Sequence, residues 1–192
     1  MSEDDVLAIF REAGALQSGH FILSSGLHSD AYLNKSIVSM YADKTARLCA
    51  ALAAKATDAF GPVDVVVAPA MGAIIYGYET ARHLERPFMF FERVDGDFAL
   101  RRGFAIAAGA PTLVVEDIVS TGLSARECVA AARREGADVK GLACLVDRSG
   151  GEADVAAPMT ALATLTVEAW PADALPPHLR DVPAVKPGSR GL

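Results

Sequence analysis

Two adjacent acids, Glu116 and Asp117, stand between an apolar run at 112–115 and a small polar run at 120–124. The apolar run is typical of a buried strand, and ligands bind at the carboxyl ends of strands in parallel sheets. Carboxylates at that position accept hydrogen bonds from sugar hydroxyls or help to hold a divalent cation. Hydroxyls, a glycine and the free N–H groups of a helix start suit a phosphate. We therefore expect a binding site for a phosphorylated sugar.

The same segment allows a plainer interpretation, in which Ser and Thr only cap a strand–turn–helix connection. The two acids at the strand end favour the binding site over that alternative. Two other phosphate-binding motifs, G-x-x-x-x-G-K-[ST] and G-x-G-x-x-G, do not occur in the sequence. The segment is therefore neither a P-loop nor a dinucleotide fingerprint.

Strands and helices that could position this site alternate along most of the chain. Short apolar runs, typical of strands covered on both faces, predict strands at 63–68, 87–91, 112–115, 141–146 and 161–167. Helical spacing and capping residues predict helices at 2–14, 43–60, about 75–84, and 124–135. This alternation predicts an α/β fold with a central parallel sheet flanked by helices.

Both ends of the chain depart from the alternating pattern. Residues 19–34 predict two short strands joined at 24–26, a hairpin. The stretch 171–192 holds half of the ten prolines, and we expect it to be irregular. We therefore expect one domain over 1–192, with a hood and base-recognition segment at about 1–40, a core at about 41–170 and a Pro-rich tail at 171–192.

The composition narrows the class of protein. A net charge of −6 disfavours binding of nucleic acid, which needs a basic surface. No apolar run approaches the roughly 18 residues of a membrane helix, and the acidic N-terminus is unlike a secretory signal or transit peptide. Cys49, Cys128 and Cys144 are odd in number and far apart, so we expect core thiols rather than disulfides or a zinc site. These features favour a cytoplasmic protein without membrane or nucleic-acid partners.

Four motifs, in order, resemble those of one enzyme family. The run at 116–124 resembles the signature of type I phosphoribosyltransferases, and 19–34 resembles the N-terminal segment of the orotate enzymes. Phe91-Glu-Arg93, followed by 100–104, resembles the flexible-loop region of one branch of the orotate enzymes. Val146-Asp-Arg148 resembles a strand end whose arginine contacts orotate in that family. The resemblance covers roughly residues 5 to 150. The tail contributes nothing to it.

The resemblance implies the type I phosphoribosyltransferase fold, an α/β sheet with a small N-terminal hood. It implies transfer of the 5-phosphoribosyl group from 5-phospho-α-D-ribose 1-diphosphate to orotate, which gives orotidine 5′-phosphate and diphosphate in pyrimidine (UMP) biosynthesis. It also implies Mg²⁺, held mainly by substrate and water near Glu116 and Asp117 with no direct protein ligand. A homodimer whose flexible loop reaches the neighbouring site is a further implication.

The resemblance also assigns roles to residues. Phosphoribosyl diphosphate should contact Glu116, Asp117, Ile118, Val119, Ser120, Thr121, Gly122, Leu123 and Ser124, with Lys35, Met71 and Gly72 near its phosphates. Orotate should meet Tyr32, Leu33 and Arg148, and Ser24 should also contact substrate. Catalysis should depend on Arg93, Arg101, Arg102 and Asp117. We further expect Asp147 to orient Arg148, and His20 and His28 to be ordinary turn histidines.

The flexible-loop region departs from the family pattern. Many orotate enzymes carry a lysine where this chain has Ser24, and lysines and a histidine in the loop, yet residues 94–100 hold no lysine. Arg101 and Arg102 are the cations left to cover a leaving diphosphate. The alternative for these two arginines is an exposed, charged hairpin.

Two other functions fit the same fold. One is a phosphoribosyltransferase for a purine base, which Arg148 argues against because its guanidinium suits a carboxylate that purine bases lack. The other is a non-catalytic regulator that senses phosphoribosyl diphosphate. A regulator would want a nucleic-acid-binding face, which the net charge of −6 disfavours.

Overall fold

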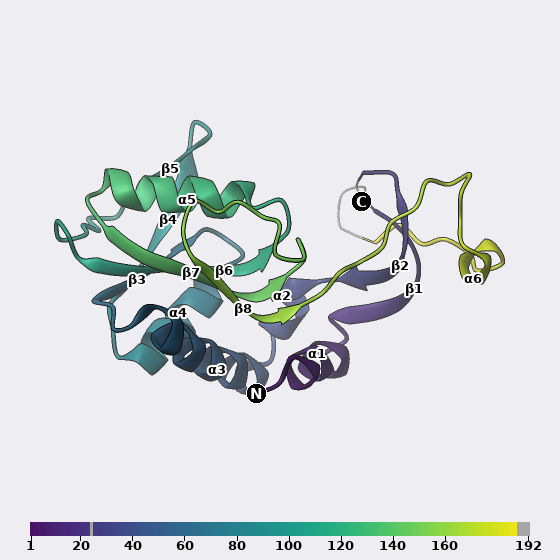
Figure 1. Cartoon of the computed structure of the whole chain (residues 1–192), viewed down its shortest axis with the longest axis horizontal. Helices are drawn as coiled ribbons and strands as arrows, with labels where there is room; N and C mark the ends of the chain where they lie inside the picture. Colours follow the sequence, from purple (N-terminus) through teal and green to yellow (C-terminus); the bar gives the residue numbers. More distant parts are fainter. Residues whose placement is uncertain (24, 188–192) are drawn as a thin grey trace.

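The computed structural model describes residues 1–23 and 25–187, and its centre is a six-stranded sheet in the order β5-β4-β3-β6-β7-β8 (Figure 1). Five strands run parallel: β3 (Val65–Pro69), β4 (Phe88–Val94), β6 (Pro111–Val119), β7 (Asp138–Asp147) and β8 (Met159–Thr164). From β3 the chain moves outward to β4, and from β6 it moves outward in the opposite direction to β7 and β8. The loops after β3 and β6 therefore diverge, and this switch point is where such sheets bind ligands.

Helices cover both faces of the sheet, as the alternating pattern predicted. α3 (Ala42–Phe60) and α4 (Ile74–Leu84) cover one face, and α5 (Leu123–Arg134) covers the other (Figure 1). Side chains of β6 enter the two faces alternately: Leu113 and Val115 pack on the α3 side and Val114 on the α5 side. Burial on both faces explains why the strands are continuously apolar. The three cysteines lie in these cores, as predicted.

The N-terminal elements lie beside the sheet. α1 (Glu3–Glu12) begins at a capping box in which Ser2 and Asp5 exchange hydrogen bonds. β1 (Leu16–Ile22) and β2 (His28–Leu33) form the predicted antiparallel hairpin, and α2 (Lys35–Val38), which the pattern did not predict, leads back to the core. We call β1 and β2 the hood hairpin.

The ends of β6 and β4 lie beyond their predicted positions. β6 continues to Val119 because Ile118 and Val119 still pair with β7, so the two acids lie within the strand and not after it. β4 continues to Val94 and turns through Asp95 (φ 52°) and Gly96 (φ 98°) into β5 (Asp97–Leu100), an antiparallel edge strand. An Asp-Gly pair between apolar runs is a hairpin signal, and it could have predicted this turn.

Residues 171–187, the described part of the tail, are mostly irregular, as expected, but they contain the short helix α6 (Pro177–Arg180) and contact the hood hairpin (Figure 1). Across the part of the chain that the structure describes, no helix combines the length and apolar character needed to cross a membrane.

Candidate active site

Asp117 is fully buried at the carboxyl end of β6 and faces Lys35. The lysine Nζ lies 2.7 Å from Oδ1 and 2.6 Å from Oδ2 of the carboxylate. Lys35 is the first residue of α2, and the Tyr76 hydroxyl donates to its carbonyl oxygen over 2.8 Å. α2 and α4 thus hold the lysine against the sheet, so a cation from the hood side of the chain enters the site.

The turn after β3 closes over the same carboxylate. A Cβ added to Gly72 would lie 2.3 Å from Oδ2 of Asp117 and 3.0 Å from Nζ of Lys35, so only glycine allows the turn to come this close. The neighbouring Met71 is 83% exposed. Of these two predicted substrate-contacting residues, Gly72 thus lies beside Asp117, at the switch point of the sheet.

Glu116 has different surroundings from Asp117. Its side chain is 6% exposed, and its Oε1 accepts a hydrogen bond from the backbone N–H of Asp117 over 3.1 Å. Burial, and then the negative charge of Asp117, raise the pKa of Glu116 to about 8. At neutral pH this side chain is therefore mainly a neutral acid that can donate a hydrogen bond.

The loop between β6 and α5 encloses a small cavity of about 60 Å³. Gly122 caps α5 at φ 77°, and a Cβ there would lie 3.1 Å from that of Ala153. Free N–H groups of the first turn of a 12-residue helix adjoin this cavity, which suits an anion. The wall consists of Glu116, Ile118, Val119, Ser120, Thr121, Gly122, Leu123, Ser124 and Ala125. We call this the phosphate cradle.

One residue of the cradle differs from the others. The Val119 side chain is 1% exposed and packs in the α5-side core, so only its backbone can meet a ligand. Its carbonyl oxygen already accepts the backbone N–H of Arg148 over 2.7 Å. The prediction that Val119 contacts the substrate can therefore apply only to its backbone.

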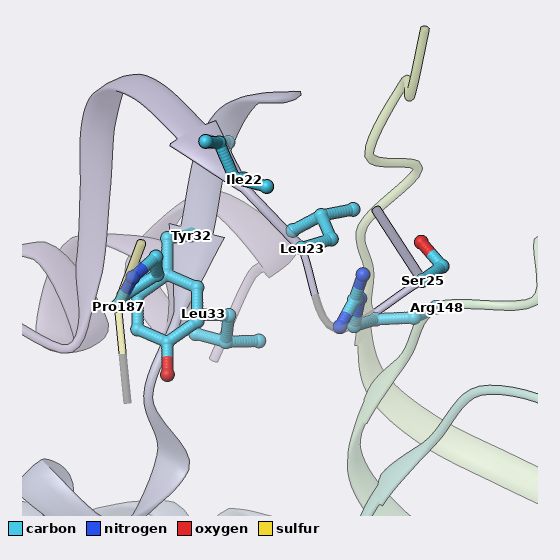
Figure 2. Close-up of a pocket in the computed structure, with 8 residues that line it drawn as sticks. Ile22, Leu23, Ser25, Tyr32, Leu33, Arg148 and Pro187 are labelled. Atoms are coloured by element: carbon cyan, nitrogen blue, oxygen red, sulfur yellow. The ribbon is translucent and has the colours of Figure 1, made fainter. Parts of the chain in front are cut away.

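A second cavity, of about 270 Å³, separates Arg148 from the hood hairpin (Figure 2). Tyr32 and Leu33 lie on one side of it and the Arg148 side chain on the other. Nε of Arg148 is buried and has no hydrogen-bond partner within residues 1–23 and 25–187. A buried guanidinium nitrogen without an acceptor is a site that an anionic ligand can complete. We call this the base cavity.

A third cavity, of about 290 Å³, connects the base cavity with the phosphate cradle. It shares Tyr32, Leu33 and Arg148 with the base cavity, and Ile118 and Ser120 with the cradle. Lys35 also lines it. The three spaces therefore form a continuous path from the hood hairpin to the start of α5.

Asp147 does not orient Arg148 through a hydrogen bond, contrary to the prediction. Its Oδ1 accepts from the N–H and the hydroxyl of Ser149 at 2.7 and 2.6 Å, and its Oδ2 accepts from Gly151 N–H at 2.8 Å. Asp147 instead holds the loop that follows β7.

Arg93 lies in β4, whereas Arg101 and Arg102 directly follow β5. None of these three predicted loop arginines lines the three cavities described above. Arg93 pairs with Glu127 of α5 and stacks 4.2 Å from the Phe98 ring centroid. Arg102 pairs with Glu92 at 2.9 Å, and Arg101 is exposed. Within one chain, therefore, the structure does not bring these cations to the site.

Sequence reasoning missed several residues of the site. Ile22, Leu23, Ser25 and Pro187 line the base cavity, and Tyr76 anchors Lys35. The first three adjoin the predicted hairpin turn and could have been inferred from it. Pro187 carried no local signal. Ser24, which we predicted to bind substrate, lies outside the described residues.

The acids of the site suit a cation that binds together with the substrate. They do not suit a cation whose ligands all come from protein side chains. Asp117 is already paired with Lys35. Within the described ranges, no three His, Cys, Asp or Glu side chains gather as a metal-binding group. A Mg²⁺ ion here would have to take most of its ligands from substrate oxygens and water.

Comparison with known proteins agrees with this geometry. The model of the phosphoribosyl transferase domain family matches residues 38–179. The chain is 59% identical over 192 residues to an orotate phosphoribosyltransferase of Phenylobacterium zucineum, covering 100% of this chain and 99% of that protein.

Solved structures share the fold at low identity. An orotate phosphoribosyltransferase of Mycobacterium tuberculosis in complex with inorganic phosphate has a TM-score of 0.67 at 23% identity, covering 85% of this chain and 95% of that one. An adenine phosphoribosyltransferase of Saccharomyces cerevisiae has a TM-score of 0.63 at 18% identity, covering 81% and 99%. The fold therefore does not by itself distinguish between bases.

Proposed function

This chain belongs to the phosphoribosyltransferase family and to its orotate branch, and from that premise we propose that it transfers 5-phosphoribosyl from phosphoribosyl diphosphate to orotate, releasing diphosphate. The observation that carries the choice of base is Arg148, whose side chain lines the base cavity and whose buried Nε has no hydrogen-bond partner among the described residues. The orotate carboxylate would supply the missing acceptor. The 59% identity to an orotate phosphoribosyltransferase, over 192 residues, supports the same choice.

At the sugar end, the phosphate cradle would hold the 5′-phosphate through the N–H groups at the start of α5. Glu116, as a neutral acid, can donate a hydrogen bond to a ribose hydroxyl, and Asp117 can accept one. Because Lys35 already pairs with Asp117 and lines the connecting cavity, it can exchange part of that contact for a substrate phosphate. Gly72 would let the diphosphate approach the backbone after β3.

At the base end, Tyr32 and Leu33 would cover the pyrimidine ring while Arg148 binds its carboxylate. A guanidinium can donate two parallel hydrogen bonds to a carboxylate, which sets the orientation of the ring as well as its affinity. The acceptor nitrogen N1 would then point along the connecting cavity toward the anomeric carbon.

In the transfer step, the bond between the anomeric carbon and the diphosphate oxygen breaks, and N1 of orotate, in its already deprotonated form, forms a bond to that carbon. Positive charge grows on the ribose and negative charge on the diphosphate. Mg²⁺, held near Glu116 and Asp117 mainly by substrate and water, would reduce the negative charge on the leaving group. Arg101 and Arg102 would contribute to the same stabilisation, and their hairpin would exclude water from the activated sugar.

Those arginines need a second copy of the chain to reach a site. Tyr78 of α4 contacts Phe88 edge to face at 6.1 Å, Phe88 lies 6.3 Å from Phe90, and Phe90 lies 5.4 Å from Phe104. Tyr78 is 60% exposed, so this row of aromatic rings is open to a partner. We propose a homodimer across this aromatic row, in which each β4–β5 hairpin serves the neighbouring site.

The test mixes purified protein, Mg²⁺ and phosphoribosyl diphosphate with orotate and follows the loss of orotate absorbance. We expect turnover of orotate and none of adenine or hypoxanthine. Turnover of a purine base without orotate would overturn the proposal. Binding of phosphoribosyl diphosphate with no base turned over would indicate a sensor of that ligand.

A further inference from the structure

The hood hairpin has only two strands, and the tail adds backbone hydrogen bonds along both of its outer edges. On the β2 edge, His28 N–H donates to the Trp170 carbonyl over 2.7 Å, and Trp170 N–H donates back over 2.8 Å. On the β1 edge, Ile22 N–H donates to the Val185 carbonyl and Val185 N–H to that of His20, each over 2.8 Å. A two-stranded hairpin is marginal by itself, so these edge contacts matter for its position.

A buried histidine ties the two edges together. His20 is 5% exposed, and its Nδ1 lies 2.7 Å from the carbonyl oxygen of Val182. A carbonyl can only accept, so this Nδ1 carries the hydrogen. Nε2 of the same ring lies 2.6 Å from Nδ1 of His28 on the other strand. The prediction that His20 and His28 are ordinary turn histidines is therefore wrong. These two histidines link β1 and β2 to the tail.

The intervening chain crosses from one edge of the hairpin to the other. It leaves the β2 edge at Trp170 and runs through α6 to Val185 at the β1 edge (Figure 1). Leu179 of α6 is 2% exposed and anchors the crossing. We call residues 170–187 the clasp, because they hold both edges of the hood hairpin.

The clasp ends in the base cavity. Pro187 lies beside Tyr32 on the wall opposite Arg148 (Figure 2). The phosphate cradle, in contrast, is lined only by residues of β6, the following loop and α5. The clasp therefore touches one end of the path between the cavities and not the other.

We propose that the clasp determines base binding: it positions Tyr32 and Leu33 through the edges of the hood hairpin and supplies Pro187 as a wall of the base cavity. Pro187 is a specificity-determining residue, and Val185 is a positioning residue that acts through β1. The proposal rests on the proposed function for the identity of the base. It predicts that damage to the clasp weakens orotate binding and leaves phosphoribosyl diphosphate binding intact.

The main test compares Val185→Pro with Val185→Ala. Proline removes the N–H that donates to His20, whereas alanine keeps it and trims a side chain that is 57% exposed. Loss of one such hydrogen bond should raise the KM for orotate about 2- to 10-fold in the proline variant. The KM for phosphoribosyl diphosphate should stay within about twofold of wild type, since the cradle is separate. The alanine variant should match wild type in both constants.

A second variant, Pro187→Trp, tests the wall itself. The indole should fill part of the base cavity, raise the KM for orotate and leave both the KM for phosphoribosyl diphosphate and the thermal unfolding midpoint unchanged. A purely structural clasp would shift both KM values or the unfolding midpoint together. Unchanged orotate KM in both variants, or equal changes for the two substrates, would overturn the proposal.

Failure of the proposed function has a different outcome. If the wild-type chain transferred phosphoribosyl to another base, the KM for that base would be the constant compared across the same variants. A selective rise in that constant would support the clasp even though orotate is not the substrate.

Discussion

The Nζ atom of Lys35 lies 2.6 Å from one carboxylate oxygen of Asp117 and 2.7 Å from the other. The carboxylate is fully buried and the lysine side chain is 39% exposed. The acid that we propose for the ribose is therefore neutralised from the hood side of the chain before any substrate enters. The Lys35–Asp117 pair should therefore affect both substrate binding and the stability of the fold.

Lys35→Ala should destabilise the fold, because a buried carboxylate loses its counter-charge. We expect a loss of about 1–3 kcal/mol in the free energy of unfolding, below the full value for a buried pair because the lysine is partly exposed. Urea denaturation measures it. Adding Asp117→Asn to Lys35→Ala should restore part of the lost free energy of unfolding. If the double variant instead lost the sum of the two single losses, a direct pairing would be contradicted.

Glu116 should make stability depend on pH. The unfolded carboxyl loses its proton near 4.5, whereas the folded one keeps it until about 8. The stabilisation from the protonated form is therefore complete below about 4.5 and is lost as the pH rises to about 8. The isosteric Glu116→Gln removes this titration.

Thermal unfolding at pH 5, 6, 7 and 8 would test this expectation. The difference in unfolding midpoint between Glu116→Gln and wild type should grow in favour of the variant as the pH rises. A difference that is constant over this range would show that Glu116 ionises as it does in the unfolded chain.

Arg148→Ala should weaken orotate far more than phosphoribosyl diphosphate. Charge-assisted hydrogen bonds to a buried carboxylate contribute about 2 kcal/mol or more, so the KM for orotate should rise at least about 30-fold. Arg148→Lys keeps the positive charge but cannot donate two parallel hydrogen bonds, so its KM for orotate should lie between those of wild type and Arg148→Ala. Steady-state kinetics with each substrate varied in turn measures both constants, and equal losses for the two substrates would refute the assigned role.

The β4–β5 hairpin should act across a dimer. The double variant Arg101→Ala, Arg102→Ala and the single variant Arg148→Ala should each have low turnover with little change in unfolding midpoint. Mixed 1:1 after reversible dissociation, they should recover about a quarter of wild-type activity, because half of the dimers are mixed and each holds one complete site. No recovery would mean that each hairpin serves its own chain.

Tyr78→Asp should dissociate the proposed dimer. A charge on the aromatic row is unfavourable in an apolar interface, so sedimentation velocity should record a smaller species than for wild type. Tyr78→Phe keeps the apolar ring and is the matched control. A Tyr78→Asp protein that sediments like wild type would place any interface elsewhere.

Local order along the chain was predictable from the sequence alone. Continuous apolar runs identified all five parallel strands because burial on both faces leaves no polar positions. The two acids and the Ser-Thr-Gly loop were identified because they come at the end of such a strand, where parallel sheets bind ligands. Arg148 was identified from the resemblance to the orotate enzymes. The length of β6 was missed, since strand pairing at Ile118 depends on Val146 and not on its neighbours in sequence.

Tertiary structure alone decided which of these residues meet. Lys35 reaches Asp117 across 82 positions of sequence, and His20 reaches Val182 across 162. Edge hydrogen bonds are made by backbone groups that every residue carries, so no side-chain pattern in the tail announces them. For that reason the Pro-rich tail carried no local signal, yet the folded chain brings Pro187 to the wall of the base cavity.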